Sequence, residues 1–321
     1  MSTTTLIQSS QQARPIGRGL VPLWSVLAWE IRRLSASRLY WCQTLGLFGL
    51  LVLLTWALRV PGHITVIKAD SGHQPEIMSG FIAATSPGGL LSILPTLLLV
   101  LVLLLPFVSA DGVTRDVARR THELVVTTAV PTWAYVWGRY LAVLATSLGL
   151  ALLLLLALIA VGEVVHLTIA DYPPPVIGGE LLLWVGMVVP ATVLVGGVGF
   201  ALSTLAPRFS MLIKVVVILG WIVGALVIPL GLGSSTKPSS WYVDWDPTSA
   251  ITAKGLLAAY AANPNPSMTG DASFQQLLLS VENKIPTTAG WLVPHLLLIL
   301  PALTLVVIAS LGYRRCRAVL S

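Results

Sequence analysis

Six long apolar runs constrain this chain more than any other feature of its sequence. A transmembrane helix needs about 20 mainly apolar residues to cross roughly 30 Å of hydrocarbon. Hydrophobic residues make up 55% of the 321 residues and charged residues 10%, a balance far more apolar than that of a soluble domain. We therefore predict an all-α polytopic membrane protein with six transmembrane helices. The predicted spans cover residues 40–60, 89–108, 140–161, 176–205, 211–232 and 291–313.

The distribution of Lys and Arg sets the orientation of the spans. Positively charged loops stay on the cytoplasmic side of a membrane. With the N-terminus inside, 14 of the 19 basic residues but 4 of the 13 acidic residues become cytoplasmic. We therefore predict that both the N- and the C-terminus are cytoplasmic, with residues 314–321 as a short tail. The net charge of +6 follows from this asymmetry and implies no nucleic-acid partner.

Residues 1–39 form the predicted cytoplasmic N-terminus, which contains an amphipathic helix. Apolar residues recur there at three- or four-residue spacing, and Glu30 and Arg33 fall away from that stripe. This pattern predicts a helix lying in the interface, with its apolar side toward lipid and its Arg side toward the headgroups. A simple basic flank before the first span is the alternative. The stripe consists of Leu20, Trp24, Leu27, Ile31 and Leu34.

Two segments on the opposite side are long enough to carry structure. Residues 61–87 read as an external loop, whose scattered His, Asp and Glu match no zinc-site spacing. Residues 233–290 form the largest external segment, with an aromatic WYVDW stretch suited to the membrane interface and helix-like stretches at 249–262 and 273–283. We interpret this segment as a lid over the outer ends of the spans; a passive loop is the alternative.

A concentration of charge marks the cytoplasmic segment 111–131. Six of the thirteen residues from 111 to 123 are charged, and each acid has a base four residues away along a helix. Such pairs stabilise a short helix by roughly a few tenths of a kcal/mol each. The segment therefore predicts an amphipathic helix that docks a partner protein, with a loop obeying the positive-inside rule as the alternative. The pairs are Asp111 with Arg115, Asp116 with Arg120, and Glu123 with Arg119.

Familiar catalytic motifs do not occur in the sequence. It has no G-x-x-x-x-G-K-[ST] phosphate loop, no H-E-x-x-H and no G-x-S-x-G. The ionisable residues Glu163, Glu180, Lys214 and His295 fall near the ends of predicted spans, where we expect their side chains to reach water. We therefore expect no catalytic residue, metal or cofactor in this chain, and an energy source outside it.

The stretch RRTHELVVTTAVPTWAYVWGRYLA resembles the segment after the second span of ABC-2 type permeases, the membrane subunits of ATP-binding-cassette exporters. That family has a charged run, then G-T-x-E-x-L, a Thr-Pro turn and Gly-Lys before the third span. Thr121, Glu123, Pro131 and Gly138–Arg139 stand at the comparable places, whereas Arg120 replaces the usual Gly. The order of an interfacial helix, six spans and an external elaboration before the last span is also similar along the whole chain.

The resemblance implies an ABC-2 type permease fold and a transport function. Two permease chains, identical or different, would pair, and separate ATPase subunits holding ATP and Mg would dock beneath them and drive efflux across the plasma (inner) membrane. The implied coupling residues are Asp111, Arg115, Asp116, Arg119, Arg120, Thr121 and Glu123. A membrane-embedded enzyme acting on lipid-linked substrates, or a scaffold or sensor subunit without transport, are the alternatives.

The fifth span suggests where two permease chains would meet. Gly220 and Gly224 form a G-x-x-x-G motif, which places two glycines on one helix face. Without Cβ atoms, another backbone can approach this face closely. We predict a dimer contact there, although such motifs also pack within a single subunit.

Overall fold

The computed structural model describes residues 20–60, 62–68, 76–109, 130–169, 172–231, 240–262 and 290–320. Within these ranges, six helical segments are long and apolar enough to cross a membrane. The six predicted spans are thereby confirmed, and the chain is a multi-pass membrane protein. The segments are Arg38–Ala57, Pro87–Ser109, Thr132–Thr168, Ile177–Leu205, Pro207–Gly231 and Leu292–Tyr313.

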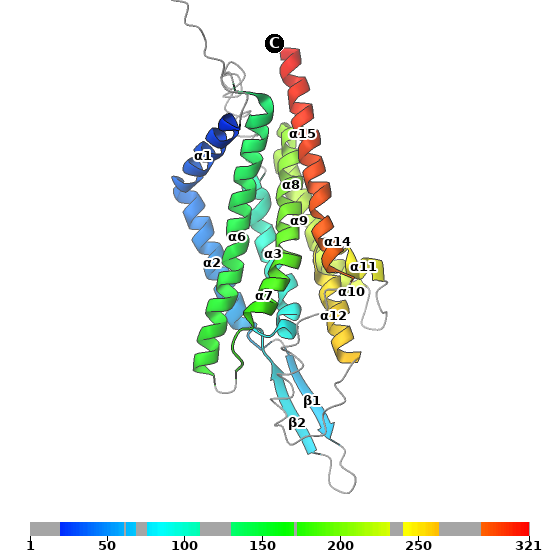
Figure 1. The fold of residues 1–321 in the computed structure, drawn as a ribbon. Helices are drawn as coiled ribbons and strands as arrows, with labels where there is room; N and C mark the ends of the chain where they lie inside the picture. Colours follow the sequence, from blue (N-terminus) through cyan, green and yellow to red (C-terminus); the bar gives the residue numbers. More distant parts are fainter. Residues whose placement is uncertain are drawn as a thin grey trace, which may run out of the picture.

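An N-terminal helix, α1 (Val21–Ser35), precedes the first span, α2 (Arg38–Ala57). The two helices meet at an angle, and α1 lies at the same end of the bundle as the C-terminal end of α15 (Figure 1). Ser37 has an extended backbone between them, and its hydroxyl accepts a hydrogen bond from the Tyr40 amide at 3.4 Å. This N-cap favours the start of a new helix at Arg38, because it satisfies one of the backbone amides that the first turn of a helix leaves without a partner.

A β-hairpin follows α2, in the segment for which the sequence predicted a loop. Strand β1 (Gly62–Lys68) pairs antiparallel with β2 (Glu76–Ile82), with Gly62 opposite Ile82 and Lys68 opposite Glu76. The hairpin projects from the end of the bundle opposite to α1 (Figure 1). The membrane part of the described chain is helical, as predicted.

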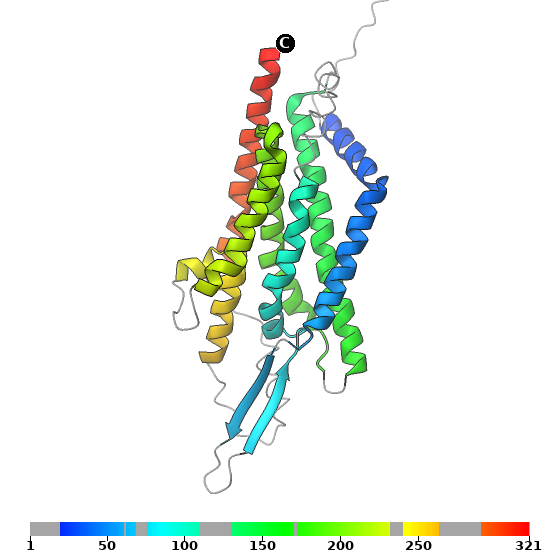
Figure 2. The same ribbon diagram turned by 180° about the vertical axis from the view of Figure 1, so that it is seen from behind.

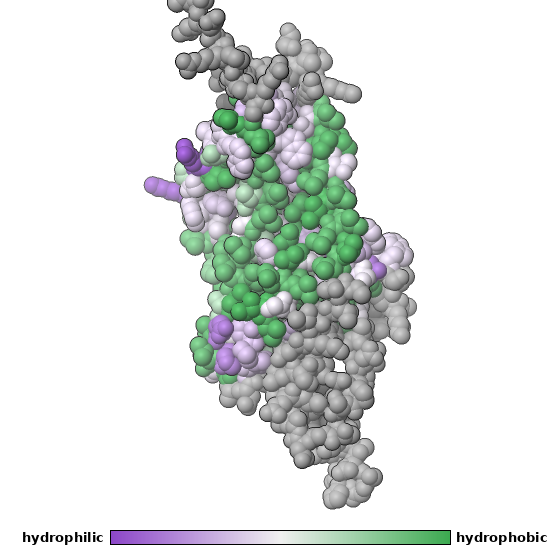
Figure 3. All heavy atoms as spheres, viewed as in Figure 1, coloured by the Kyte–Doolittle hydropathy of each residue, from purple (hydrophilic) through white to green (hydrophobic). Residues whose placement is uncertain are grey.

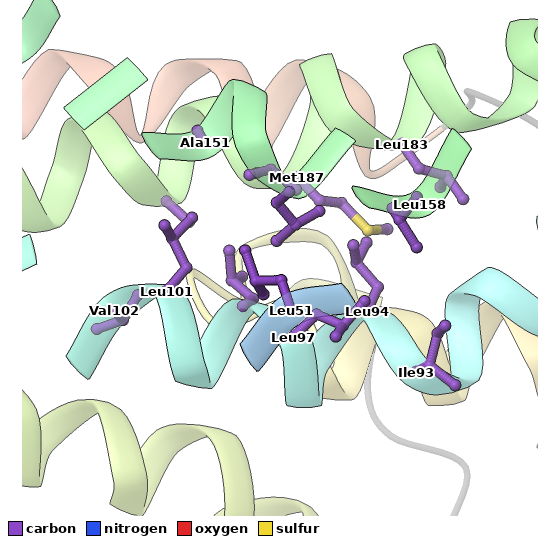
Figure 4. Packing of buried hydrophobic residues seen from close by; sticks show 14 of the residues in the cluster. Leu51, Ile93, Leu94, Leu97, Leu101, Val102, Ala151, Leu158, Leu183 and Met187 are labelled. Carbon is purple, nitrogen blue, oxygen red and sulfur yellow. The ribbon is translucent and has the colours of Figure 1, made fainter. Parts of the chain in front are cut away.

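The core of the bundle forms where α3 (Pro87–Ser109), α6 (Thr132–Thr168) and the fourth span pack together. Leu97, Leu98 and Leu101 of α3 are fully buried, and Figure 4 shows how the labelled leucines of α3 face Met187, Leu183 and Leu158. Helix α6 begins eight residues before the predicted start of the third span. Arg139 does not end the apolar helix, because its side chain is covered by α1.

The fourth and fifth spans each contain a π-helical turn ahead of a proline. A proline lacks an N–H and its ring clashes with the carbonyl four residues earlier. In both spans the π turn hydrogen-bonds across five residues, as from the Val189 amide to the Trp184 carbonyl, so it accommodates Pro190 and Pro229 without ending the helix. The elements are α7 (Ile177–Leu183), η1 (Trp184–Val188) and α8 (Val189–Leu205), then η2 (Pro207–Phe209), α9 (Ser210–Ile222), η3 (Val223–Val227) and α10 (Ile228–Gly231).

Two helices precede the last span at the hairpin end of the bundle: α11 (Ser240–Asp244) and α12 (Ala250–Ala262). Helix α12 confirms the helix predicted at 249–262 and packs against α3; residues 273–283 lie outside the described chain. The Asp246 carboxylate accepts hydrogen bonds from the Thr248 amide at 2.9 Å and the Ile251 amide at 2.7 Å, which anchors the start of α12. The last span consists of α14 (Leu292–Leu297) and α15 (Ile299–Leu320).

The outer surface of the bundle is apolar, as a membrane requires. Figure 3 shows hydrophobic residues across the middle of this face, with hydrophilic residues near α1 and at the far end of α6. Helix α9, which faces the viewer in Figure 2, contacts α3 and α8 but buries little of its own surface. Its exposed residues, such as Met211, Leu212 and Val216, would lie against lipid.

Candidate functional site

The predicted docking segment joins the α1 end of the bundle to the third span. Its seven candidate residues (Asp111, Arg115, Asp116, Arg119, Arg120, Thr121 and Glu123) lie outside the described residues, and the docking role stays a prediction. Pro131, at the end of the segment, is described: its extended backbone precedes α6, and its carbonyl accepts a hydrogen bond from the Tyr135 amide at 3.2 Å. The segment therefore leads directly into the longest helix of the chain.

Gly138 brings α1 against the first turns of α6. A Cβ atom at this position would lie 2.9 Å from Val26 Cβ and 3.1 Å from the Leu23 carbonyl oxygen. A Cβ atom essentially never comes within 3.0 Å of a non-bonded atom of another residue, so only glycine lets the two helices approach this closely. The residue matched to the Gly of the permease motif is thus the contact point for the N-terminal helix.

A buried ionic cluster lies beside this contact. Glu30 of α1 is 3% exposed and Arg139 of α6 is 2% exposed, and Arg139 Nη1 lies 3.7 Å from Glu30 Oε1. Arg33 also donates a hydrogen bond to Glu30 Oε1. Glu30 falls away from the apolar stripe, as the sequence pattern indicated, and α6 covers that side of α1. Three residues of the predicted apolar stripe are on the outer surface: Leu20, Trp24 and Ile31 are exposed at 62%, 59% and 39%.

Aromatic rings enclose the Arg139 guanidinium and extend the cluster to the last span. Its Cζ lies 5.5 Å from the Trp29 ring centre and 5.0 Å from the Tyr135 ring centre, within the range of cation–π attraction. Tyr135 in turn stacks on Tyr313 of α15, with centroids 5.8 Å apart and planes at 27°. We call Glu30, Arg33, Arg139, Trp29 and Tyr135 the α1–α6 clamp.

The clamp holds α1 against the start of α6. A buried charge loses its hydration, and the effective penalty of several kcal/mol per ion is offset only by close partners. Glu30 of α1 and Arg139 of α6 are such close partners for each other. The rings of Trp29 and Tyr135 cover the Arg139 guanidinium further. The clamp therefore ties α1 to the start of α6.

Three of the four ionisable residues expected to reach water are buried instead. Glu163 is exposed, but Glu180, Lys214 and His295 are 1%, 8% and 1% exposed. The Lys214 ammonium lies 5.3 Å from the Phe107 ring centre, and His295 Nδ1 lies 2.9 Å from the Trp291 carbonyl oxygen. Within the described residues, no three His, Cys, Asp or Glu side chains gather as a metal site would require.

The two glycines of the G-x-x-x-G motif have different surroundings. Gly220 has open space where a Cβ atom would stand, whereas a Cβ atom on Gly224 would lie 2.8 Å from Thr248 Cγ2. The Thr248 hydroxyl also donates to the Gly224 carbonyl at 3.4 Å. Gly224 thus accommodates the turn before α12 of its own chain, while the dimer contact predicted at these glycines stays a prediction.

The comparisons with known proteins do not assign this chain to a family. No protein-family model matches the chain, and no curated protein matches it. The sequence pattern had singled out Gly138–Arg139 but not Glu30, Trp29 or Tyr135. The spacing of Glu30 and Arg33 is a recognisable ion pair on a helix, but only the packed structure reveals that a second helix covers it.

Proposed function

We propose that this chain is the permease subunit of an ATP-binding-cassette exporter in the plasma (inner) membrane. It would pair with a second permease chain, and separate ATPase subunits holding ATP and Mg would drive efflux. The observation that carries the proposal is the α1–α6 clamp. It fixes the interfacial helix to the helix that follows the charged segment 111–131, where the resemblance to ABC-2 type permeases is strongest.

Helix α6 offers a direct mechanical path from a docked ATPase to the far side of the membrane. Its 37 residues form one continuous helix, about 55 Å long at 1.5 Å per residue. A push on the segment before Thr132 would be transmitted along the whole bundle, because α6 packs on α2, α3, α8 and α15. The clamp would make α1 move as part of the same rigid unit.

The orientation belongs to the same proposal. Among the described residues, bases predominate on the elements at the α1 end and acids on those toward the hairpin end. The α1 end has Arg32, Arg33, Arg38, Arg139 and Arg208 beside Glu30, and the hairpin end has Glu163, Glu180, Asp244 and Asp246 beside Arg59 and Lys254. The positive-inside rule then makes the α1 end cytoplasmic and puts both termini inside the cell. The segment 111–131 would be on the side where ATP is available.

Charge reversal in the docking segment tests the proposal. Arg119→Glu and Glu123→Lys should abolish the stimulation of the partner's ATP hydrolysis by the permease while leaving membrane insertion intact. Arg208→Glu is the matched control, because Arg208 is an exposed arginine at the same end of the bundle but in the turn between the fourth and fifth spans. Full stimulation by a variant with several of the segment's charges reversed would refute the docking role.

A further inference from the structure

The elbow between α1 and α2 carries two arginines on its outer side. Arg32 is in the last turn of α1, Arg38 is the first residue of α2, and both are exposed. Strongly hydrophilic residues project from the bundle beside α1 (Figure 3). Within the described chain, neither guanidinium has an ion pair, a hydrogen bond or an aromatic ring in contact. Both charges are therefore available to a partner outside the chain.

The nearest acid in the sequence does not compensate these charges. Glu30 is 3% exposed and is paired with Arg33 and Arg139, on the side of α1 that α6 covers. Arg32 follows Glu30 by two residues, which is about 200° around a helix of 3.6 residues per turn, and it is exposed. From residue 20 to residue 57, both exposed charged side chains are arginines. The exposed side of the elbow thus has a positive charge.

The position of Arg38 on α2 sets its depth in a membrane. Leu47 and Leu51 mark the side of α2 that packs into the bundle. Arg38 precedes Leu47 by nine residues, or two and a half turns, so it lies on the opposite side of the helix. Leu45, two turns after Arg38 on that same side, is 65% exposed. A charge on the lipid-facing side of a span avoids the hydrocarbon only at the end of the span, beside the lipid headgroups.

Hydrogen bonds across the elbow hold α1 and α2 in their relative position. The Trp41 indole Nε1 donates to the Ser35 carbonyl oxygen at 2.7 Å, while the Trp41 side chain remains on the surface at 50% exposed. The Ser35 hydroxyl donates to the Arg32 carbonyl oxygen at 3.0 Å. Trp is typical of the membrane–water interface, so its ring supports the same depth for the elbow. We call Arg32, Arg38 and Trp41 the elbow site.

We propose that the elbow site binds an anionic phospholipid from the leaflet at the α1 end of the bundle. The two guanidiniums pair with the headgroup phosphate, and the acyl chains lie along the exposed side of α2 past Trp41 and Leu45. Phosphatidylglycerol has a net negative charge, whereas phosphatidylcholine compensates its phosphate with its own ammonium group. The site therefore selects the anionic lipid. This selectivity goes beyond a basic flank that only orients the span, and it is independent of the proposed transport function.

Native mass spectrometry of the purified full chain tests the site. Titration with phosphatidylglycerol or phosphatidylcholine in detergent micelles gives the Kd of the first bound lipid of each kind, and the wild type should bind phosphatidylglycerol more tightly. Arg32→Gln and Arg38→Gln should each raise the Kd for phosphatidylglycerol about fivefold, the effect of one arginine near an anionic lipid surface. The Kd for phosphatidylcholine should not change. Both variants should keep the wild-type melting temperature, because neither side chain has a partner in the described chain.

Arg208→Gln separates a local site from an effect of net charge. Arg208 is an exposed arginine at the same end of the bundle, in the turn between the fourth and fifth spans. Its substitution removes the same charge and should leave the Kd for phosphatidylglycerol unchanged. An equal rise of that Kd in Arg208→Gln would overturn the proposal. So would equal affinity of the wild type for the two lipids, or an unchanged Kd for phosphatidylglycerol when Arg32 and Arg38 are both replaced by Gln.

Discussion

Replacing Glu30 by Gln removes the negative charge that contacts both Arg33 and Arg139, while nearly preserving the side-chain volume. The Arg139 and Glu30 side chains are 2% and 4% exposed, and their nearest charged atoms are 3.7 Å apart. At an effective dielectric constant of 20, two charges at this distance attract by about 4 kcal/mol before desolvation is counted. Removing one partner of a buried pair typically costs about 3–5 kcal/mol.

Arg33 provides an internal control for this argument. Its side chain is 26% exposed, so its guanidinium keeps part of its hydration and its pairing with Glu30 is screened. We therefore expect Glu30→Gln and Arg139→Gln each to lower the free energy of unfolding by about 3 kcal/mol. Arg33→Gln should lower it by less than about 1 kcal/mol.

Reversible unfolding in mixed micelles measures these differences, and a double-mutant cycle isolates the pair. For contacting residues we expect a coupling energy between Glu30 and Arg139 of about 1–3 kcal/mol. Two results would refute the reasoning. One is additivity of the two substitutions within about 0.5 kcal/mol, and the other is a cost for Arg33→Gln as large as that for Arg139→Gln.

Three further substitutions test the packing around the spans. Gly138→Ala should lower the melting temperature because its Cβ meets Val26, and Val26→Ala in the same chain should restore part of the loss; no rescue would show that the contact is unimportant. Gly197→Ala should lower the free energy of unfolding by about 1–3 kcal/mol, because its Cβ would lie 2.9 Å from Ala302 Cβ. Gly149→Ala is the control: its Cβ enters open space and should not lower that free energy, so equal losses in the two variants would contradict the packing argument. Asp246→Ala should destabilise α12 by about 1 kcal/mol, because the hydrogen bonds to the start of that helix are lost. Faster proteolysis within residues 233–290 would reveal this loss, and unchanged proteolysis would disprove it.

Length and hydropathy were sufficient to predict the six spans, because each must satisfy its backbone hydrogen bonds across the same apolar layer. The start of α6 was missed for a specific reason. Arg139 reads as the hydrophilic edge of a span, and the sequence does not reveal that α1 buries it. The burial of Glu30 was missed for the same reason, since a helical pattern identifies faces but not the neighbour that covers each one.

The half of the molecule toward the hairpin was predicted less completely. The helix at 249–262 follows from its composition, but the anchoring of its start by Asp246 depends on backbone amides that a sequence pattern does not position. Likewise, the G-x-x-x-G motif indicates that another segment packs closely at Gly220 and Gly224, but it does not identify that segment. The structure supplies Thr248 of the same chain at Gly224 and an open cavity at Gly220.

Purification of the tagged chain from its native membranes tests the central claim most directly. A permease subunit predicts that a separate polypeptide with a phosphate loop co-purifies in a fixed ratio, and that the complex hydrolyses ATP. The Arg119→Glu and Glu123→Lys variants should lose that subunit or its stimulation, while Arg208→Glu retains both. Purification of the stably folded chain from its native membranes without any ATPase would contradict the account.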